Sequence, residues 1–162
     1  MMNRCDIVVV DLGTRRTKNL TSDSGLSDEH PLYSPDGRLI AYHAFDTARA
    51  FNDQGHLRLL DRKTRQSRRI ATAFDRATTH LSWTPESSAL LSLTEDRGRV
   101  GLWRMPIDDS APAEVVAGGV LSRFARSADA SALVYARDTA SYPPALFASP
   151  AGTGRASGRS SR

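Results

Sequence analysis

The chain carries the side chains from which serine hydrolases build a catalytic triad: abundant serines and aspartates, and four histidines, His30, His43, His56 and His80. Catalysis by such a triad also requires an oxyanion hole beside the serine, and α/β-hydrolases hold that serine in a Gly-x-Ser-x-Gly turn. No Gly-x-Ser-x-Gly occurs in the 162 residues. We therefore expect no catalytic residue and no enzymatic activity on this chain.

A metal or cofactor site is also not expected. His30 and His80 fall at similar places in two repeated segments, which would bring two imidazoles near each other. Protein metal sites need three or four ligands, and the single cysteine excludes a multi-thiolate cluster. We predict that Cys5 is a small packed side chain beside a strand.

Three aspartates, Asp11, Asp61 and Asp108, recur at the same point of a repeated segment. Such a set could form a carboxylate array. Recurrence in every copy instead favours a structural role, in which each carboxylate accepts hydrogen bonds from backbone N–H groups of a hairpin turn.

The repeat itself sets the fold. Ser34-Pro35-Asp36-Gly37 is typical of a tight turn, because proline presets φ and glycine accepts a positive φ. Weaker copies begin at Thr84 and Ser127, spaced by 50 and 43 residues, which is the size of one four-stranded propeller blade. In the copies Ser87 and Ala130 replace the glycine, at a cost of about 1–2 kcal/mol. An apolar run follows each turn and predicts a strand buried on both faces: Leu39–Phe45, Ala89–Leu93 and Leu133–Ala136.

The pattern predicts an all-β fold: a partial β-propeller of about three four-stranded antiparallel blades in an open arc, over residues 1–150. The blade portions are expected at about 6–21, 28–71, 78–117 and 120–149. Residues 151–162 form a basic tail that we expect to be disordered. Because an open arc leaves apolar blade faces uncovered, self-association through those faces is expected.

The order and spacing of the repeated residues resemble those in the β-propeller domain of the prolyl oligopeptidase family. The segments Tyr33–Tyr42, Leu59–Thr64 and Leu81–Ser87 carry the resemblance, which extends over about residues 6–148 and points to the bacterial dipeptidyl aminopeptidase and acylaminoacyl-peptidase-like branch. The resemblance implies a non-catalytic, substrate-gating propeller whose separate hydrolase domain performs catalysis. The implied partners are a peptide or a protein, such as that hydrolase domain or further blades.

The chain departs from the family pattern at three positions. Arg15 and Arg65 stand where a glycine is usual, and Arg126 stands where an aromatic residue is usual. Phe124, two positions earlier on the same strand face, is expected to cover the last site. The departures suggest a truncated or decaying copy of a peptidase propeller.

The Ser-Pro-Asp-Gly turn is also similar to that of the periplasmic propeller of the Tol system. An alternative function is therefore a stand-alone scaffold for protein interaction. In either case substrate or partner contacts are expected on the two long connections, because loops on rigid scaffolds carry binding residues. The candidates are Arg49, Phe51, Asn52, Asp53, Phe74 and Arg76.

Charge and hydropathy argue against other partners. The net charge is +4, but three arginines lie in the tail, which leaves 19 basic against 18 acidic residues elsewhere. The basic cluster around Arg62–Arg69 has no interleaved aromatic residue to stack a base, so no nucleic-acid partner is expected. The longest aliphatic run, Ile7–Val10, is too short to span a membrane. No signal-peptide pattern follows Met1, so the cytoplasm is the default location, although related proteins can be periplasmic.

Overall fold

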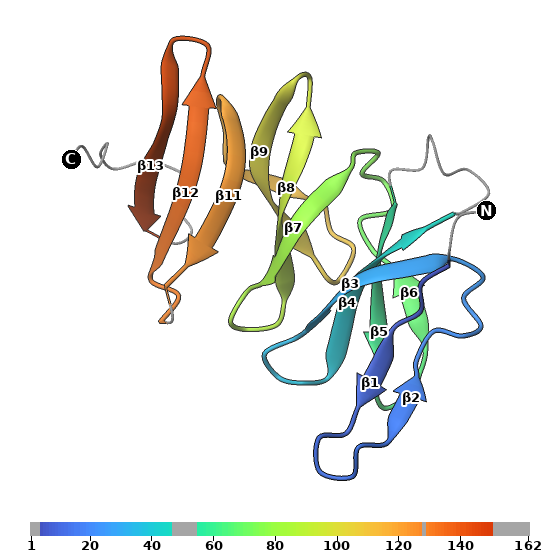
Figure 1. Ribbon diagram of the computed structural model, residues 1–162. Helices are drawn as coiled ribbons and strands as arrows, with labels where there is room; N and C mark the ends of the chain where they lie inside the picture. The colour runs from blue at the N-terminus through green and yellow to red at the C-terminus, as the bar shows by residue number, and fades with distance from the viewer. Residues whose placement is uncertain (1–3, 47–54, 128, 151–162) are drawn as a thin grey trace. The chain divides into compact units, whose positions relative to one another are not determined.

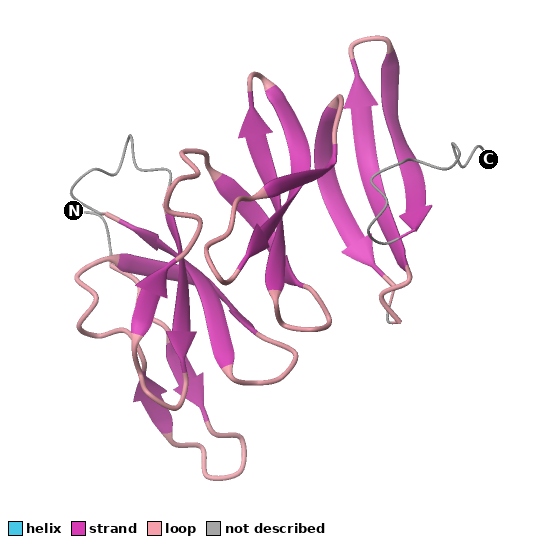
Figure 2. Ribbon diagram, turned by 180° about the vertical axis from the view of Figure 1, so that it is seen from behind, coloured by secondary structure: helices cyan, strands magenta, loops and turns pink. Residues whose placement is uncertain are grey.

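The computed structural model describes residues 4–46, 55–127 and 129–150, and these residues form β-strands and loops (Figures 1 and 2). The predicted all-β class is confirmed. None of the described residues forms a helix long and apolar enough to cross a membrane. The strands are β1 (Val8–Val10), β2 (Thr17–Asn19), β3 (Ser27–Tyr33), β4 (Leu39–Phe45), β5 (His56–Asp61), β6 (Ser67–Arg69), β7 (Thr78–Trp83), β8 (Ala89–Asp96), β9 (Arg99–Pro106), β10 (Ala113–Val116), β11 (Val120–Arg126), β12 (Ala132–Thr139) and β13 (Tyr142–Pro150).

The chain divides into two compact units at Ile70. In the first unit, β1 and β2 form a two-stranded antiparallel sheet, and β3-β4-β5-β6 form a four-stranded meander. The apolar side chains of the two sheets pack together, because Ile7 precedes β1 while Ile40, Tyr42, Ala44 and Leu60 lie on one face of the meander. The two sheets therefore share one core.

In the second unit, β7-β8-β9-β10 form a meander and β11-β12-β13 form a second one. A single parallel bridge, Val120 to Val100, joins β11 to β9. The face of one meander packs on the face of the other, as stacked blades do. Among the described strands β13 is the edge strand of the second meander, and its nine residues include three prolines. The shared core consists of Leu91, Leu93, Leu102, Val116, Leu121, Leu133 and Tyr135.

The three repeated turns have the same hydrogen bonds. In the first, Gly37 N–H donates to the Ser34 carbonyl at 2.8 Å, and Leu39 N–H donates to Ser34 Oγ at 2.8 Å. Thr84 and Ser127 accept the corresponding bonds from the amides three and five residues later, at 2.9–3.1 Å. The predicted repeat of hairpins is confirmed. The hydroxyl at the first position, which is buried in Ser34 and Thr84 and half-buried in Ser127, fixes the register of the strand that follows each turn.

The positions that lack the expected glycine keep the left-handed backbone. φ is +69° at Gly37, +57° at Ser87 and +59° at Ala130. Arg15 and Arg65, the two other departures from the family pattern, have φ of +56° and +65°. The repeat therefore imposes the turn geometry on residues with a Cβ, at the energetic cost that the sequence predicted.

Ala130→Gly is expected to stabilise the chain by about 0.5–1 kcal/mol. Relief of the left-handed strain outweighs the larger entropy that glycine has in the unfolded state. Urea unfolding followed by circular dichroism measures the change. Gly37→Ala, at the matching turn position, is the control and is expected to lose about 1 kcal/mol. A lower urea midpoint for Ala130→Gly would contradict this account of the turn.

One strand prediction is wrong. Along β4 and β8 the first six side chains are buried, as expected for strands covered on both faces. In β12 burial alternates instead, and Val134 is 41% exposed. The run Leu133–Ala136 is covered on one face only, because no further sheet of the described residues packs against the other.

Candidate functional site

The connection between β6 and β7 carries two of the predicted contact residues, Phe74 and Arg76. The Arg76 guanidinium lies over the Phe74 ring at 4.9 Å and over the Trp103 ring at 5.5 Å, and the two ring centroids are 5.0 Å apart. Arg76 Nε also forms an ion pair with Asp96 Oδ1 at 3.0 Å. We call Phe74, Arg76, Asp96 and Trp103 the Arg76 cluster. Its contacts anchor the connection to β8 and β9.

A cavity of about 380 Å³ at the β8–β9 hairpin adjoins the Arg76 cluster and shares Asp96 with it. Two arginines and two acids line it, so the lining has no net formal charge. Trp103 Nε1 is buried beside Gly101 and has no hydrogen-bond partner among the described residues. Trp103 does not line the cavity, so the two guanidinium groups and the two carboxylates are the charged groups that it offers to a ligand. The lining residues are Asp96, Arg97, Arg99, Gly101, Glu114, Ala117 and Gly118.

The other predicted contact residues, Arg49, Phe51, Asn52 and Asp53, lie outside the described residues. Contact of Phe74 and Arg76 with a substrate stays a prediction. Both side chains already contact partners within the chain, so a ligand could contact only the parts of them that these partners leave exposed.

The histidines do not gather into a metal centre over the described ranges, where no three histidine, cysteine, aspartate or glutamate side chains could hold an ion. His30 and His80 occupy matching irregularities of β3 and β7, with φ of +56° and +52°. Cys5 is exposed, so the prediction that it is packed is wrong. Its backbone binds β3, since Asp28 N–H donates to the Cys5 carbonyl at 2.8 Å, but its side chain points outward.

The recurring aspartates cap hairpin turns, as predicted. Asp11 Oδ1 accepts from Thr14 N–H at 2.7 Å, Asp61 Oδ1 from Thr64 N–H at 3.0 Å, and Asp108 Oδ1 from Ser110 N–H at 3.1 Å. Hydrogen bonds from these residues lower the pKa of each carboxyl. In the third repeated turn, hydrogen bonds from the Ser127 hydroxyl and from Ser131 lower the pKa of Asp129 to about 2. The carboxylates are therefore ionised and occupied at neutral pH.

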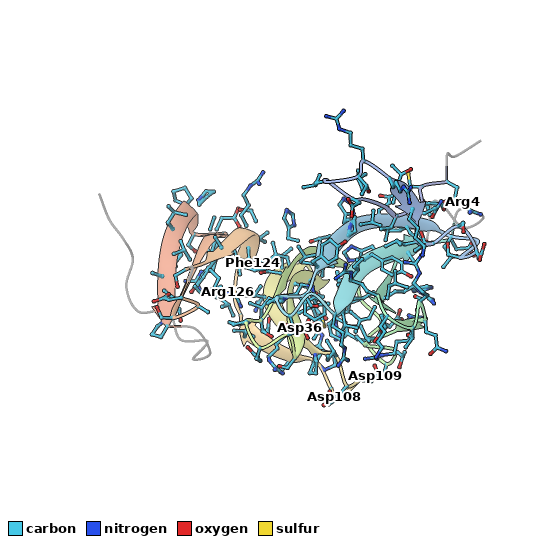
Figure 3. The ribbon with its side chains drawn as sticks, turned by 90° about the horizontal axis from the view of Figure 1, so that it is seen from below. Arg4, Asp36, Asp108, Asp109, Phe124 and Arg126 are labelled. Carbon is cyan, nitrogen blue, oxygen red and sulfur yellow. The ribbon has the colours of Figure 1, made fainter. Side chains whose placement is uncertain are left out.

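A second hollow, of about 290 Å³, lies between β7–β10 and the β11–β12 hairpin. We call it the Arg126 groove. Arg126 projects into it from the same side of β11 as Phe124, which packs against the shared core (Figure 3). The sequence marked Arg126 as unusual, but nothing in it placed Arg104 and Glu86 beside it. The lining residues are Thr84, Pro85, Glu86, Leu91, Arg104, Val115, Arg126, Ala130 and Leu133.

One buried acid escaped the sequence analysis. Asp28 is 2% exposed, and neither carboxylate oxygen has a hydrogen-bond partner among the described residues. No pattern in the sequence marks this carboxylate as buried.

No protein-family model matches the chain. Dipeptidyl-peptidase 5 of Porphyromonas gingivalis is 24% identical over 113 residues, which are 70% of the chain and 16% of that protein. Dipeptidyl-peptidase 5 of Aspergillus fumigatus is 32% identical over 110 residues, 64% of the chain and 15% of that protein. The chain thus spans about one-sixth of the length of these relatives.

These matches confirm the predicted resemblance to the prolyl oligopeptidase family. The propeller domain of the trilobed protease from Pyrococcus furiosus has a TM-score of 0.67 and 17% identity, over 88% of the chain and 40% of that domain. TolB from Acinetobacter baumannii has a TM-score of 0.70 and 21% identity, over 93% of the chain and 36% of that protein. The chain therefore has the fold of part of a β-propeller, and propellers of both kinds share it.

Proposed function

We propose that the chain is a non-catalytic propeller segment of a peptidase of the prolyl oligopeptidase type, which stacks with a further blade and contributes to the gating of peptide substrates. The observation that carries this proposal is the face of the β11–β13 meander that carries Val134, against which no other sheet of the described residues packs. Support for the peptidase assignment comes from the two dipeptidyl-peptidase 5 relatives.

The repeat identifies what fits on that face. Ala41, Leu91 and Val134 each lie seven residues after the first residue of their hairpin turn. Ala41 and Leu91 are 0% and 8% exposed, whereas Val134 is 41% exposed. Leu91 is buried because the next meander packs on it. Val134 occupies the same register position in β12, so the apolar face of another blade would bury it in the same way.

Val134 is not the only apolar residue on this face of the described meander. Leu146 of β13 is 58% exposed, and the register places it and Ala136 as neighbours on the side of the sheet that carries Val134. In the first unit Val8 and Val10 of β1 are 51% and 50% exposed. A second copy of the chain can supply such a face, so we take a second copy as the occupant in the purified protein.

The proposal predicts that the purified chain self-associates, and that Val134→Glu with Leu146→Glu weakens this association at least about tenfold, since two buried charges would oppose stacking. Sedimentation velocity at chain concentrations from about 1 to 100 µM measures the change in the dissociation constant. This range is on the order of the dissociation constants expected for modest apolar interfaces. Leu12→Glu is the matched control, because Leu12 is 91% exposed in the β1–β2 turn. A chain that stays monomeric at all concentrations, or a double variant that associates as well as the parent, would overturn stacking.

A second candidate function is a stand-alone scaffold that binds a folded protein. The likeness to TolB favours it. The two candidates differ in their ligands: the gating segment is expected to bind short unstructured peptides without hydrolysing dipeptidyl p-nitroanilides, whereas the scaffold is expected to ignore such peptides. Titration with a mixture of tripeptides, followed by amide chemical shifts, separates them.

A further inference from the structure

The Arg126 groove has one cation without a counter-charge. Arg104 is paired, since its Nη2 lies 3.7 Å from Glu86 Oε1 and donates to Ser88 Oγ at 3.1 Å. Arg126 is half-buried, and its side chain forms no hydrogen bond, ion pair or ring contact with the described residues. Partial burial removes water from a guanidinium, and an anionic ligand restores the lost interactions. The groove thus offers a bidentate donor to a carboxylate.

The floor of the groove is aliphatic. Leu91 and Leu133 are 8% and 4% exposed and belong to the shared core, and Val115 packs against them. A volume of about 290 Å³ is at the lower end for ligand pockets and suits a ligand of about one residue. The Glu86 carboxylate at the rim repels a second negative charge. The ligand that fits has one carboxylate and one aliphatic side chain.

One of the two other copies of the repeat has a buried ring at the position of Arg126. Tyr33, Trp83 and Arg126 each directly precede the first residue of their turn. Trp83 is 3% exposed, so in that copy a large ring is buried at this position. In the third copy an arginine replaces the ring, and Ala130 replaces the turn glycine beside it. Compared with Trp83 in the second copy, Arg126 thus places a cation at the edge of the groove where a buried ring would otherwise lie.

We propose that the Arg126 groove binds the C-terminal residue of a peptide that ends in an aliphatic side chain. The terminal carboxylate pairs with the Arg126 guanidinium, and the side chain lies on Leu91 and Leu133. The inference deepens the peptide-gating part of the proposed function and rests on it, and it does not apply to a scaffold, which is expected to ignore short peptides. The inference does not depend on blade stacking, because all of these residues lie within the second unit.

N-acetyl-leucine, N-acetyl-leucinamide and N-acetyl-aspartate are the probes, titrated into the chain while amide chemical shifts are recorded. We expect N-acetyl-leucine to bind with a millimolar dissociation constant, as so small a ligand does, and to shift the amides of Thr84, Glu86, Leu91, Arg126, Ala130 and Leu133. The amide lacks the charge and is expected to bind at least about tenfold more weakly, and the dicarboxylate likewise. Equal binding of the acid and the amide, shifts located elsewhere, or no binding would overturn the proposal.

Two arginines on β11 provide a matched pair of variants. Arg126→Gln is expected to weaken N-acetyl-leucine binding at least about tenfold, whereas Arg123→Gln, at an exposed position of the same strand, leaves it unchanged. Arg126→Lys keeps the charge but loses the fork, so an intermediate affinity is expected. Amide spectra of each variant report whether the sheet is intact. Equal loss in Arg123→Gln and Arg126→Gln would show a nonspecific charge effect and would also overturn the proposal.

Discussion

Replacing Leu102 with alanine is expected to lower the free energy of unfolding by about 2–5 kcal/mol. Leu102 lies in β9 and is 0% exposed, in the core that joins the β7–β10 and β11–β13 meanders. The loss combines the transfer free energy of the deleted methyl groups with the cavity left between two sheets. Two stacked sheets cannot close such a cavity without losing other contacts, so the cost is expected in the upper part of that range.

Urea unfolding measured by circular dichroism and tryptophan fluorescence tests this expectation. Leu146→Ala is the control, because Leu146 is 58% exposed, and it is expected to change the free energy of unfolding by less than about 0.5 kcal/mol. The comparison is made at a concentration where the chain is monomeric. Similar losses for the two variants would mean that the meanders do not share a core.

Gly119→Ala is the second change with a large expected effect, more than about 2 kcal/mol. Gly119 begins the connection into β11 with φ of +74°, where any Cβ is strained, and a Cβ there would overlap the carbonyl oxygen of Asp138 in β12. Because that oxygen belongs to backbone, the two strands must separate locally. Val120, the next residue, forms both the pairing with Asp138 and the bridge to Val100, so this separation weakens both contacts.

The neighbouring glycine separates the steric effect from the backbone strain. Gly118 has φ of +85°, but a Cβ there would meet nothing within 4 Å. Gly118→Ala is therefore expected to cost only the strain, about 1–2 kcal/mol. Thermal unfolding of the two variants provides the measurement. If Gly118→Ala destabilises as much as Gly119→Ala, the close approach of Asp138 is not what limits residue 119.

The sequence predicted the elements well because short-range chemistry specifies them. Each hairpin turn contains a hydroxyl residue and a proline or an acid, and the first turn also has a glycine at the position of positive φ, so β4 and β8 could be placed to within a few residues. The burial of β12 could not be predicted in the same way. Local sequence shows that a strand such as Leu133–Ala136 is apolar, but only its neighbours decide how many of its faces are covered.

The candidate site was harder to predict than the fold. The sequence marks Phe74 and Arg76 only as loop residues, yet both contact Trp103, which lies about thirty positions away in β9. Arg126 was noticed as a departure from the repeat. Its pairing state depends on Arg104 and Glu86, which lie in a different meander. Contacts between elements that are distant in sequence leave no periodic signal, so the groove emerged only from the structure.

The prolines of β13 bear on how the protein behaves when concentrated. A strand with three prolines among nine residues has fewer N–H donors to offer an incoming strand, so lateral extension of the meander is disfavoured. Growth by ladder formation, the route to fibrils, is thereby hindered at one border, while face-to-face contact through Val134 remains open. High expression should consequently produce small soluble assemblies in preference to amyloid-like material.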